Sequence, residues 1–396
     1  MSAFPSLRRL NGLYILLHLV YWAMFAAFAG YQTALVLNRG FSSADAGVFV
    51  AIRCLAGIFA QPLIGSWADR HRTVPLKRIL VVCLLAALAV NGVLIAARPG
   101  FWGMAAIFLA LGVLELNAYP LLDSMAVQFI SVGLEIRYSL CRGLGSLSYA
   151  VSCVLLGRQA AALGVETLLW THLGLLILMI LVSAAFPAFP QEALPPLAEG
   201  ERPHSVWYLI RSSRSFAWML AAVFFALAAV MPIVSFMVSL VGEQGGDESH
   251  LGLALFLMAA SELPAALLFP ALHRRLGSGG TLALSVVFMG LKPLFFLLAP
   301  DLWWLLAVQP VQMLGYGLFT PASVYYANEN VSQADRIQGQ SVMMMASNGL
   351  GAMFGNLLAG YAVDWGGCGA MLRMCLGLGI VGMVCCAVSL RTGRGR

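Results

Sequence analysis

The chain contains 396 residues, of which 61% are hydrophobic and only 10% are charged. Soluble domains typically contain about 45–50% apolar and about 25% charged residues, so this composition excludes a soluble enzyme and a disordered chain. The net charge of +6 could indicate a nucleic-acid partner. Basic loops on the cytoplasmic side of a membrane protein explain the charge better, and we therefore expect contact with a lipid bilayer and none with nucleic acid.

Long apolar runs alternate with short clusters of Arg, Asp, Pro and Gly along the whole sequence. A helix that crosses a bilayer needs roughly 20 mostly apolar residues. The first run is too long for a removable signal peptide, so we interpret it as a first membrane helix. The sequence thus predicts an all-α membrane protein with twelve transmembrane helices. They are expected at residues 11–37, 43–67, 75–97, 101–129, 137–158, 163–187, 213–241, 250–273, 279–299, 302–327, 337–362 and 368–390.

One longer polar connection, rich in proline and acidic residues, divides these spans into six and six. We predict a six-helix bundle at residues 1–188, a cytoplasmic linker at 189–212 and a second bundle at 213–396. If both termini are cytoplasmic, most lysines and arginines fall in loops on that side, as the positive-inside rule requires. We therefore expect a multi-pass protein of a bacterial inner membrane with both termini in the cytoplasm.

Six charged side chains fall inside the predicted spans, where a charge at mid-membrane costs at least ~2.5 kcal/mol. Three are acidic and three are basic, so they can neutralise one another within a cavity. Each is therefore a candidate functional residue. They are Arg53, Glu115, Asp123, Arg142, Glu262 and Lys292.

Two neighbouring spans carry polar residues at helical spacing. Glu115, Tyr119 and Asp123 follow one another at intervals of four and are expected on one face of the fourth span. Tyr149 follows Arg142 two turns later on one face of the fifth. We predict that Asp123 and Arg142 form a charge-assisted pair that binds substrate, and that Tyr149 stacks on it.

The end of the second span reads Gly65-Ser-Trp-Ala-Asp69-Arg70. This segment resembles the G-x-x-x-D-R loop between helices two and three of major facilitator transporters. With twelve spans and a midpoint linker, the resemblance implies two six-helix bundles that rock about a site at the membrane midplane. It assigns Gly65, Asp69 and Arg70 to a loop that controls conformation and does not bind substrate.

The spans on either side of the linker sharpen this resemblance. Pro-Leu-Leu-Asp123 followed by Arg142-Gly-Leu-Gly-Ser-Leu-Ser-Tyr149 is similar to helices four and five of the lactose permease branch, which includes oligosaccharide and phenylpropionate permeases. Glu262 resembles the glutamate of helix eight, and Lys292 stands where the branch has an intramembrane arginine. The resemblance implies a sugar or glycoside substrate and symport with protons.

The chain departs from this branch in its second half. Gln312 and Gly315 replace the histidine and the proton-carrying glutamate of helix ten, and Asn348 replaces a lysine of helix eleven. The coupling proton therefore needs another acid. Glu262 is the preferred candidate, because Lys292 on the next span can stabilise its charge. Glu115 and Arg53 are assigned to the same charge network.

Trp22, Gln312 and Asn348 are expected to complete the substrate site, because their stacking and hydrogen-bonding groups suit a hydroxylated solute. Helix–helix hydrogen bonds would produce the same pattern. An aromatic-acid or nucleoside permease and an uncoupled facilitator remain alternatives. No metalloprotease, nucleophile-elbow or phosphate-loop spacing is present, so we predict no enzyme, no ATP-driven pump, no cofactor and no metal. We expect a monomer.

Overall fold

The structure is a computed structural model that describes residues 6–71, 73–190, 206–332 and 335–393. Every regular element in these ranges is a helix. The elements before the linker are α1 (Leu7–Ala29), α2 (Gln32–Asn38), α3 (Ser43–Arg70), α4 (Leu76–Ala96), α5 (Phe101–Glu115), α6 (Ala118–Ser131), α7 (Tyr138–Leu163) and α8 (Thr167–Ala185). Those after it are α9 (Val206–Ser212), α10 (Arg214–Ser235), α11 (Met237–Glu243), α12 (Glu248–Ala260), α13 (Glu262–Leu297), α14 (Leu302–Val308), η2 (Gln309–Met313), α15 (Tyr316–Asn330), α16 (Arg336–Met344), η4 (Met345–Gly351) and α17 (Ala352–Gly393).

Nine segments of the described residues are long and apolar enough to cross a membrane. The two longest each contain a sharp break, at Gly277 with φ 69° and at Gly367 with φ 68°, where glycine permits a backbone turn that ends one helix and starts the next. Each of these segments therefore supplies two spans. The combination of α14, η2 and α15 adds one more. The prediction of an all-α protein with twelve transmembrane helices is confirmed.

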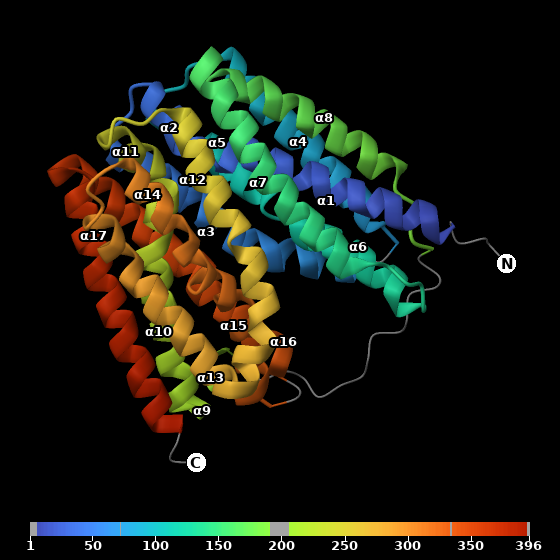
Figure 1. Cartoon of the computed structure of the whole chain (residues 1–396). Helices are drawn as coiled ribbons and strands as arrows, with labels where there is room; N and C mark the ends of the chain where they lie inside the picture. The colour runs from blue at the N-terminus through green and yellow to red at the C-terminus, as the bar shows by residue number, and fades with distance from the viewer. Residues whose placement is uncertain (1–5, 72, 191–205, 333–334, 394–396) are drawn as a thin grey trace.

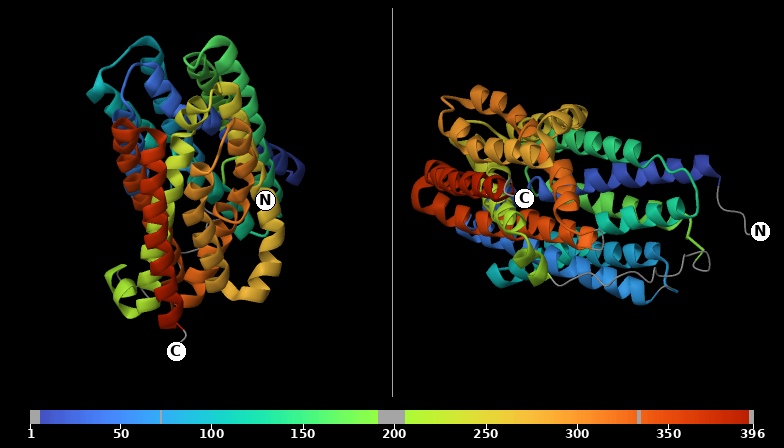
Figure 2. Two further views of the ribbon diagram at one scale, coloured as in Figure 1. Left: turned by 60° about the vertical axis from the view of Figure 1, so that its left-hand side comes forward. Right: turned by 90° about the horizontal axis from the view of Figure 1, so that it is seen from below.

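The helices on the two sides of the linker, called here the first and the second half, converge at one end and diverge at the other (Figure 1). We call the end near α2, α11 and α14 the closed end, and the end where both termini lie the open end. The views of Figure 2 agree, since α1 points toward its terminus away from the helices of the second half. One apolar core cluster runs through the first half and continues into the closed end of the second, whereas another is confined to the second half.

The closed end is held by a carboxylate that caps a helix of the opposite half. Asp364 of α17 accepts hydrogen bonds from the backbone N–H groups of Ser43 and Ala44, at 2.9 and 2.8 Å, where α3 begins. A carboxylate at this position satisfies amides without a helical partner and interacts favourably with the helix dipole. The backbones are very close here, because a Cβ on Gly47 would lie 3.0 Å from the Cα of Gly360.

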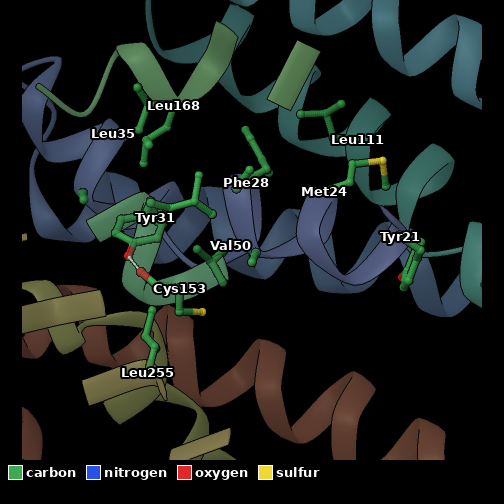
Figure 3. Close-up of a cluster of buried hydrophobic side chains, with 14 of the residues drawn as sticks. Tyr21, Met24, Phe28, Tyr31, Leu35, Val50, Leu111, Cys153, Leu168 and Leu255 are labelled. Carbon is green, nitrogen blue, oxygen red and sulfur yellow. Dashed lines mark hydrogen bonds between the residues drawn. The ribbon is translucent and has the colours of Figure 1, made fainter. Parts of the chain in front are cut away.

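A second contact between the halves joins α7 to α12. On the side of the first half, the hydroxyl of Tyr31 donates to the backbone oxygen of Cys153 at 2.6 Å, and Leu255 of α12 projects toward the same region from the second half (Figure 3). A Cβ on Gly157 would lie 2.9 Å from the Cα of Gly252. Small residues thus allow direct backbone packing between the two halves at the closed end.

An ion pair fixes the closed end of the first half. The Arg39 guanidinium contacts both carboxylate oxygens of Glu166 at 2.8 Å and donates to the backbone oxygen of Leu94. These hydrogen bonds from Arg39 hold the pKa of the Glu166 carboxyl below its ordinary value. The end of α2 and the beginning of α8 are therefore tied to the end of α4.

We expect Asp364→Asn to weaken the closed end, because the amide retains one acceptor oxygen and loses the charge. The loss of an N-cap costs about 1 kcal/mol of stability, which corresponds to roughly a fivefold decrease in the ratio of closed to separated forms. Pulsed electron paramagnetic resonance between spin labels at Arg98 and Gln244, exposed loop residues in the two halves, measures this shift. Asp301→Asn is the matched control, since Asp301 caps α14 within its own half. Identical distance distributions in the two variants would contradict the capping role.

Candidate functional site

Apart from Glu262, the intramembrane charges outside the predicted substrate site are more buried than the residues predicted to bind substrate. All of them except Gln312 are half-buried and keep some contact with solvent, namely Trp22, Asp123, Arg142, Tyr149 and Asn348. By contrast, the side chains of Arg53, Glu115 and Lys292 are buried. The structure therefore separates a solvent-accessible group from charges that are enclosed by protein.

The Arg142 guanidinium lies between two aromatic rings. It is 4.7 Å from the ring centre of Trp22 and 5.5 Å from that of Tyr119, distances at which a cation is attracted to the ring face. Its Nη1 donates to the hydroxyl of Ser146 at 2.9 Å, one turn along α7. Tyr149 packs edge-to-face against Trp22 with ring centres 6.1 Å apart. The structure brings Trp22, Arg142 and Tyr149 together and adds Tyr119, for which no role was predicted.

Asp123 occupies a different environment from the one expected. The hydroxyls of Tyr119 and Tyr138 interact with its carboxylate, and its Oδ1 is buried without a hydrogen-bond partner among the described residues. Arg142 attracts Asp123 through space, but no direct ion pair joins these two described residues. The expected direct contact is therefore absent from this conformation, because the aromatic rings and Ser146 hold the guanidinium instead.

The fourth span is interrupted, which corrects the expectation of one continuous face. α5 ends at Glu115 and α6 begins at Ala118. Pro120 has no N–H to donate to the backbone oxygen of Leu116, and that oxygen instead accepts from Gln61 at 3.4 Å. Glu115 consequently ends one helix, while Tyr119 and Asp123 belong to the next.

In the second half, Gln312 lies between the two predicted partners. Lys292 Nζ donates to Gln312 Oε1 at 2.7 Å, and Gln312 Nε2 donates to Glu262 Oε1 at 3.5 Å. Nearby, the Tyr316 hydroxyl donates to Asn348 Oδ1 at 3.0 Å. The amide of Gln312 thus links Lys292 to Glu262, which the sequence analysis expected to interact directly.

Both amides lie in irregular helix. Gln312 belongs to the 3-10 helix η2, and Asn348 to the π-helix η4. The chain leaves helical geometry at Gly315, whose backbone oxygen accepts from the hydroxyl of Ser285 at 2.8 Å. Such departures re-aim side chains and are frequent at functional sites.

The two groups face each other across the halves. Glu262 interacts electrostatically with Arg142 and with Tyr149, and Tyr316 interacts with Arg142. The half-buried residues of both halves therefore form one candidate site, with aromatic and cationic groups on one side and amides and a carboxylate on the other.

A third polar group is enclosed in the first half. Arg53 Nη2 donates to Glu115 Oε2 at 3.0 Å, and Arg53 Nη1 donates to Gln32 Oε1 at 3.3 Å. His172 Nε2 lies 3.1 Å from Glu115 Oε1, and His172 Nδ1 lies 3.1 Å from Asn91 Oδ1. Arg53 and Glu115 were predicted to share one network with Glu262, whereas His172 and Asn91 were not predicted, because each is the only residue of its type in its helix.

The predicted conformational loop lies at the open end of α3. Gly65 and Arg70 are exposed there, whereas the side chain of Asp69 lies outside the described residues. Within the described part of the chain, no group of three His, Cys, Asp or Glu side chains could hold a metal ion.

Comparisons with known proteins identify the family. The model of the MFS_1 like family, a major facilitator family, matches residues 8–374. The chain belongs to this family. It is 26% identical over 379 residues to a maltose permease of Geobacillus stearothermophilus, covering 94% of the chain and 93% of that protein. It is 21% identical to an uncharacterized transporter, YwbF, of Bacillus subtilis, covering 84% and 81%.

The fold of this major facilitator protein is similar to solved transporters. The nucleoside transporter NupG superposes with a TM-score of 0.77 at 16% identity, covering 97% of the chain and 98% of that structure. The relatives are transporters and not enzymes. The protein is therefore a membrane-embedded secondary transporter of small solutes, as the sequence predicted.

We expect Gly145→Ala to weaken binding of the transported solute by roughly tenfold. A Cβ on Gly145 would overlap the ring of Trp22 and displace it from Arg142, with the loss of a cation–π contact of ~1–2 kcal/mol. Counterflow in proteoliposomes, run with sugars, nucleosides and aromatic acids, measures the affinity for whichever solute is exchanged. Gly143→Ala is the control, because no atom lies within 4 Å of its Cβ. Equal losses in both variants would show that Trp22 does not support the site.

Proposed function

We propose that this transporter carries a sugar or glycoside across a bacterial inner membrane in symport with protons, as a monomer with both termini in the cytoplasm. The observation that carries the proposal is a set of unsatisfied polar atoms beside Arg142. Trp22 Nε1 is a buried donor and Asp123 Oδ1 a buried acceptor, and neither has a hydrogen-bond partner among the described residues. An unpaired buried polar group costs about 1–3 kcal/mol, which a hydroxylated solute would relieve.

The surroundings of these atoms suit a sugar ring. Asp123 would accept from hydroxyl groups, Arg142 and the Trp22 indole would donate to them, and Tyr149 would stack on the apolar face of the ring. Gln312 and Asn348 would contribute from the second half. The similarity to a maltose permease supports a sugar of this class.

The arrangement of the halves suggests an alternating-access cycle. With cytoplasmic termini, the open end faces the cytoplasm and the closed end, held by Asp364, faces outward. We propose that the loop of Gly65, Asp69 and Arg70 contacts the opposite half when the open end closes. Asp69 would then do at one end what Asp364 does at the other.

A nucleoside is the second candidate. The similarity in fold to NupG and the cluster of Trp22, Tyr119 and Tyr149 favour a solute with a flat ring. Counterflow against a panel of sugars, nucleosides and aromatic acids distinguishes the candidates. Exchange of sugars alone supports the proposal, and exchange of nucleosides or aromatic acids alone overturns the substrate class.

We expect Asp123→Asn and Arg142→Gln each to reduce affinity for the exchanged solute by at least ~10-fold, since each removes a charged hydrogen-bonding group. Calorimetry on purified protein measures the affinity. Arg137→Gln, an exposed arginine at the start of the same helix, is the matched control and should bind normally. Near-normal affinity in either site variant would remove that residue from the binding site.

We expect Glu262→Gln to abolish solute-driven proton uptake and accumulation while preserving exchange between equal solute concentrations. The reason is that hydrogen bonds link Glu262 through Gln312 to Lys292. Movement of Gln312 or Lys292 can therefore change the proton affinity of Glu262. A pH electrode in lightly buffered proteoliposomes measures uptake. Glu329→Gln, an exposed acid of the same half, is the control. Normal proton uptake in Glu262→Gln would exclude Glu262, and no uptake in the wild-type protein would favour facilitated diffusion.

A further inference from the structure

The enclosed polar cluster of the first half draws one residue from each of four helices. Arg53 comes from α3, Asn91 from α4, Glu115 from α5 and His172 from α8. Arg53 is 4% exposed, and the other three side chains are fully buried. The solute site does not use these groups, and hydrocarbon and protein offer no water to compensate them. Their charges and polar atoms must therefore be compensated by one another and by adjacent protein groups.

The orientation of the Asn91 amide determines where the histidine carries its proton. Asn91 Nδ2 donates to the backbone oxygen of Leu169 at 3.1 Å, so its Oδ1 must face His172. An amide oxygen can only accept, and His172 Nδ1 therefore carries a proton and donates it. In a neutral imidazole the other nitrogen, Nε2, would then present a lone pair.

That nitrogen faces a carboxylate oxygen. His172 Nε2 lies 3.1 Å from Glu115 Oε1, while Glu115 Oε2 is already bound by Arg53. Two lone pairs at this distance repel each other, and a proton between them converts the repulsion into a charge-assisted hydrogen bond. We propose that Glu115 and His172 together bind one proton, and that this pair is a second proton-binding site of the transporter, separate from Glu262.

The surroundings favour the additional positive charge. The ring of Phe28 lies 5.2 Å from the Arg53 guanidinium and has its centre 5.5 Å from that of the His172 ring. Attraction between cations and aromatic faces thus supports both groups. The other titratable side chains that face the cluster are Tyr21 of α1 and Cys54 of α3, which are uncharged at neutral pH. The negative charge of the Glu115 carboxylate accordingly keeps the additional proton on His172 Nε2.

A small cavity lies beside this cluster. It has room for about one water molecule and lies between α1, α2 and α8. Its lining includes Gln32, which contacts Arg53, and Leu169, whose backbone oxygen binds Asn91. The lining also includes Tyr31, whose hydroxyl belongs to the contact between the halves at the closed end. The proton site is therefore adjacent to the closed end.

The test uses the full-length protein, labelled with 15N-histidine and studied by nuclear magnetic resonance at pH 8. An ordinary histidine, with a pKa of about 6.5, is mostly neutral at this pH. We expect both ring nitrogens of His172 to be protonated, with the signal assigned by its loss in His172→Gln. His18 is the internal control, because it is buried in the same half and neither nitrogen has a partner, so it should be neutral. A neutral His172 ring in the wild-type protein overturns the proposal.

Two substitutions of one residue test the mechanism. Asn91→Leu removes the acceptor for Nδ1, so the ring can place its only proton on Nε2 and donate it to Glu115. We expect His172 to be neutral at pH 8 in this variant. Asn91→Asp retains an acceptor and should keep both nitrogens protonated. If Asn91→Leu does not fold, Glu115→Gln replaces it, because the amide can donate to an unprotonated Nε2. A fully protonated ring in the folded Asn91→Leu or Glu115→Gln variant contradicts the proposed site.

Discussion

The structure depends on the requirement that polar groups within a membrane-spanning protein find their partners inside the protein. In two clusters the charges meet this requirement through neighbouring side chains, since Arg53 pairs with Glu115 and Gln312 joins Lys292 to Glu262, although Arg53 Nε has no hydrogen-bond partner among the described residues. The group around Arg142 meets it only in part, because Trp22 and Asp123 retain unpaired atoms. A site for a hydroxylated solute is expected where compensation is incomplete, and the half-buried residues occur at that place.

Hydrogen bonds and close backbone contacts join the two halves at the closed end. Such contacts can break and form again during a transport cycle. Asp364 binds two backbone amides of α3, and the facing glycines allow the backbones to touch without interlocking side chains. Separation therefore breaks a few hydrogen bonds together with the contacts of the apolar cluster that continues from the first half into the second. The resemblance of the Gly65 loop to the family motif places an acid, Asp69, at the opposite end. An acid capping a helix at either end would provide two alternative closed states of comparable stability.

Hydropathy predicted the twelve spans because every span must bury about 20 apolar residues in the bilayer, whatever its neighbours are. The breaks within spans could not be predicted, because the side chains that bind the backbone oxygens of Leu116 and Gly315, namely Gln61 and Ser285, come from other helices. Spacing identified Arg142 and Tyr149 as one face but could not reveal that rings separate Arg142 from Asp123. His172 escaped notice because a single histidine in an apolar helix has no partner in the local sequence.

The amide of Gln312 explains how the second half can hold an acid and a base without an ion pair between them. Its oxygen accepts from Lys292 and its nitrogen donates to Glu262, so one uncharged group compensates both charges. A carboxylate at this position would attract Lys292 strongly and repel Glu262. A leucine would leave both charges without partners. An amide holds the two weakly enough that a small movement of η2 can change the environment of Glu262. The irregular geometry of η2, followed by the break at Gly315, allows such a movement without unwinding a regular helix.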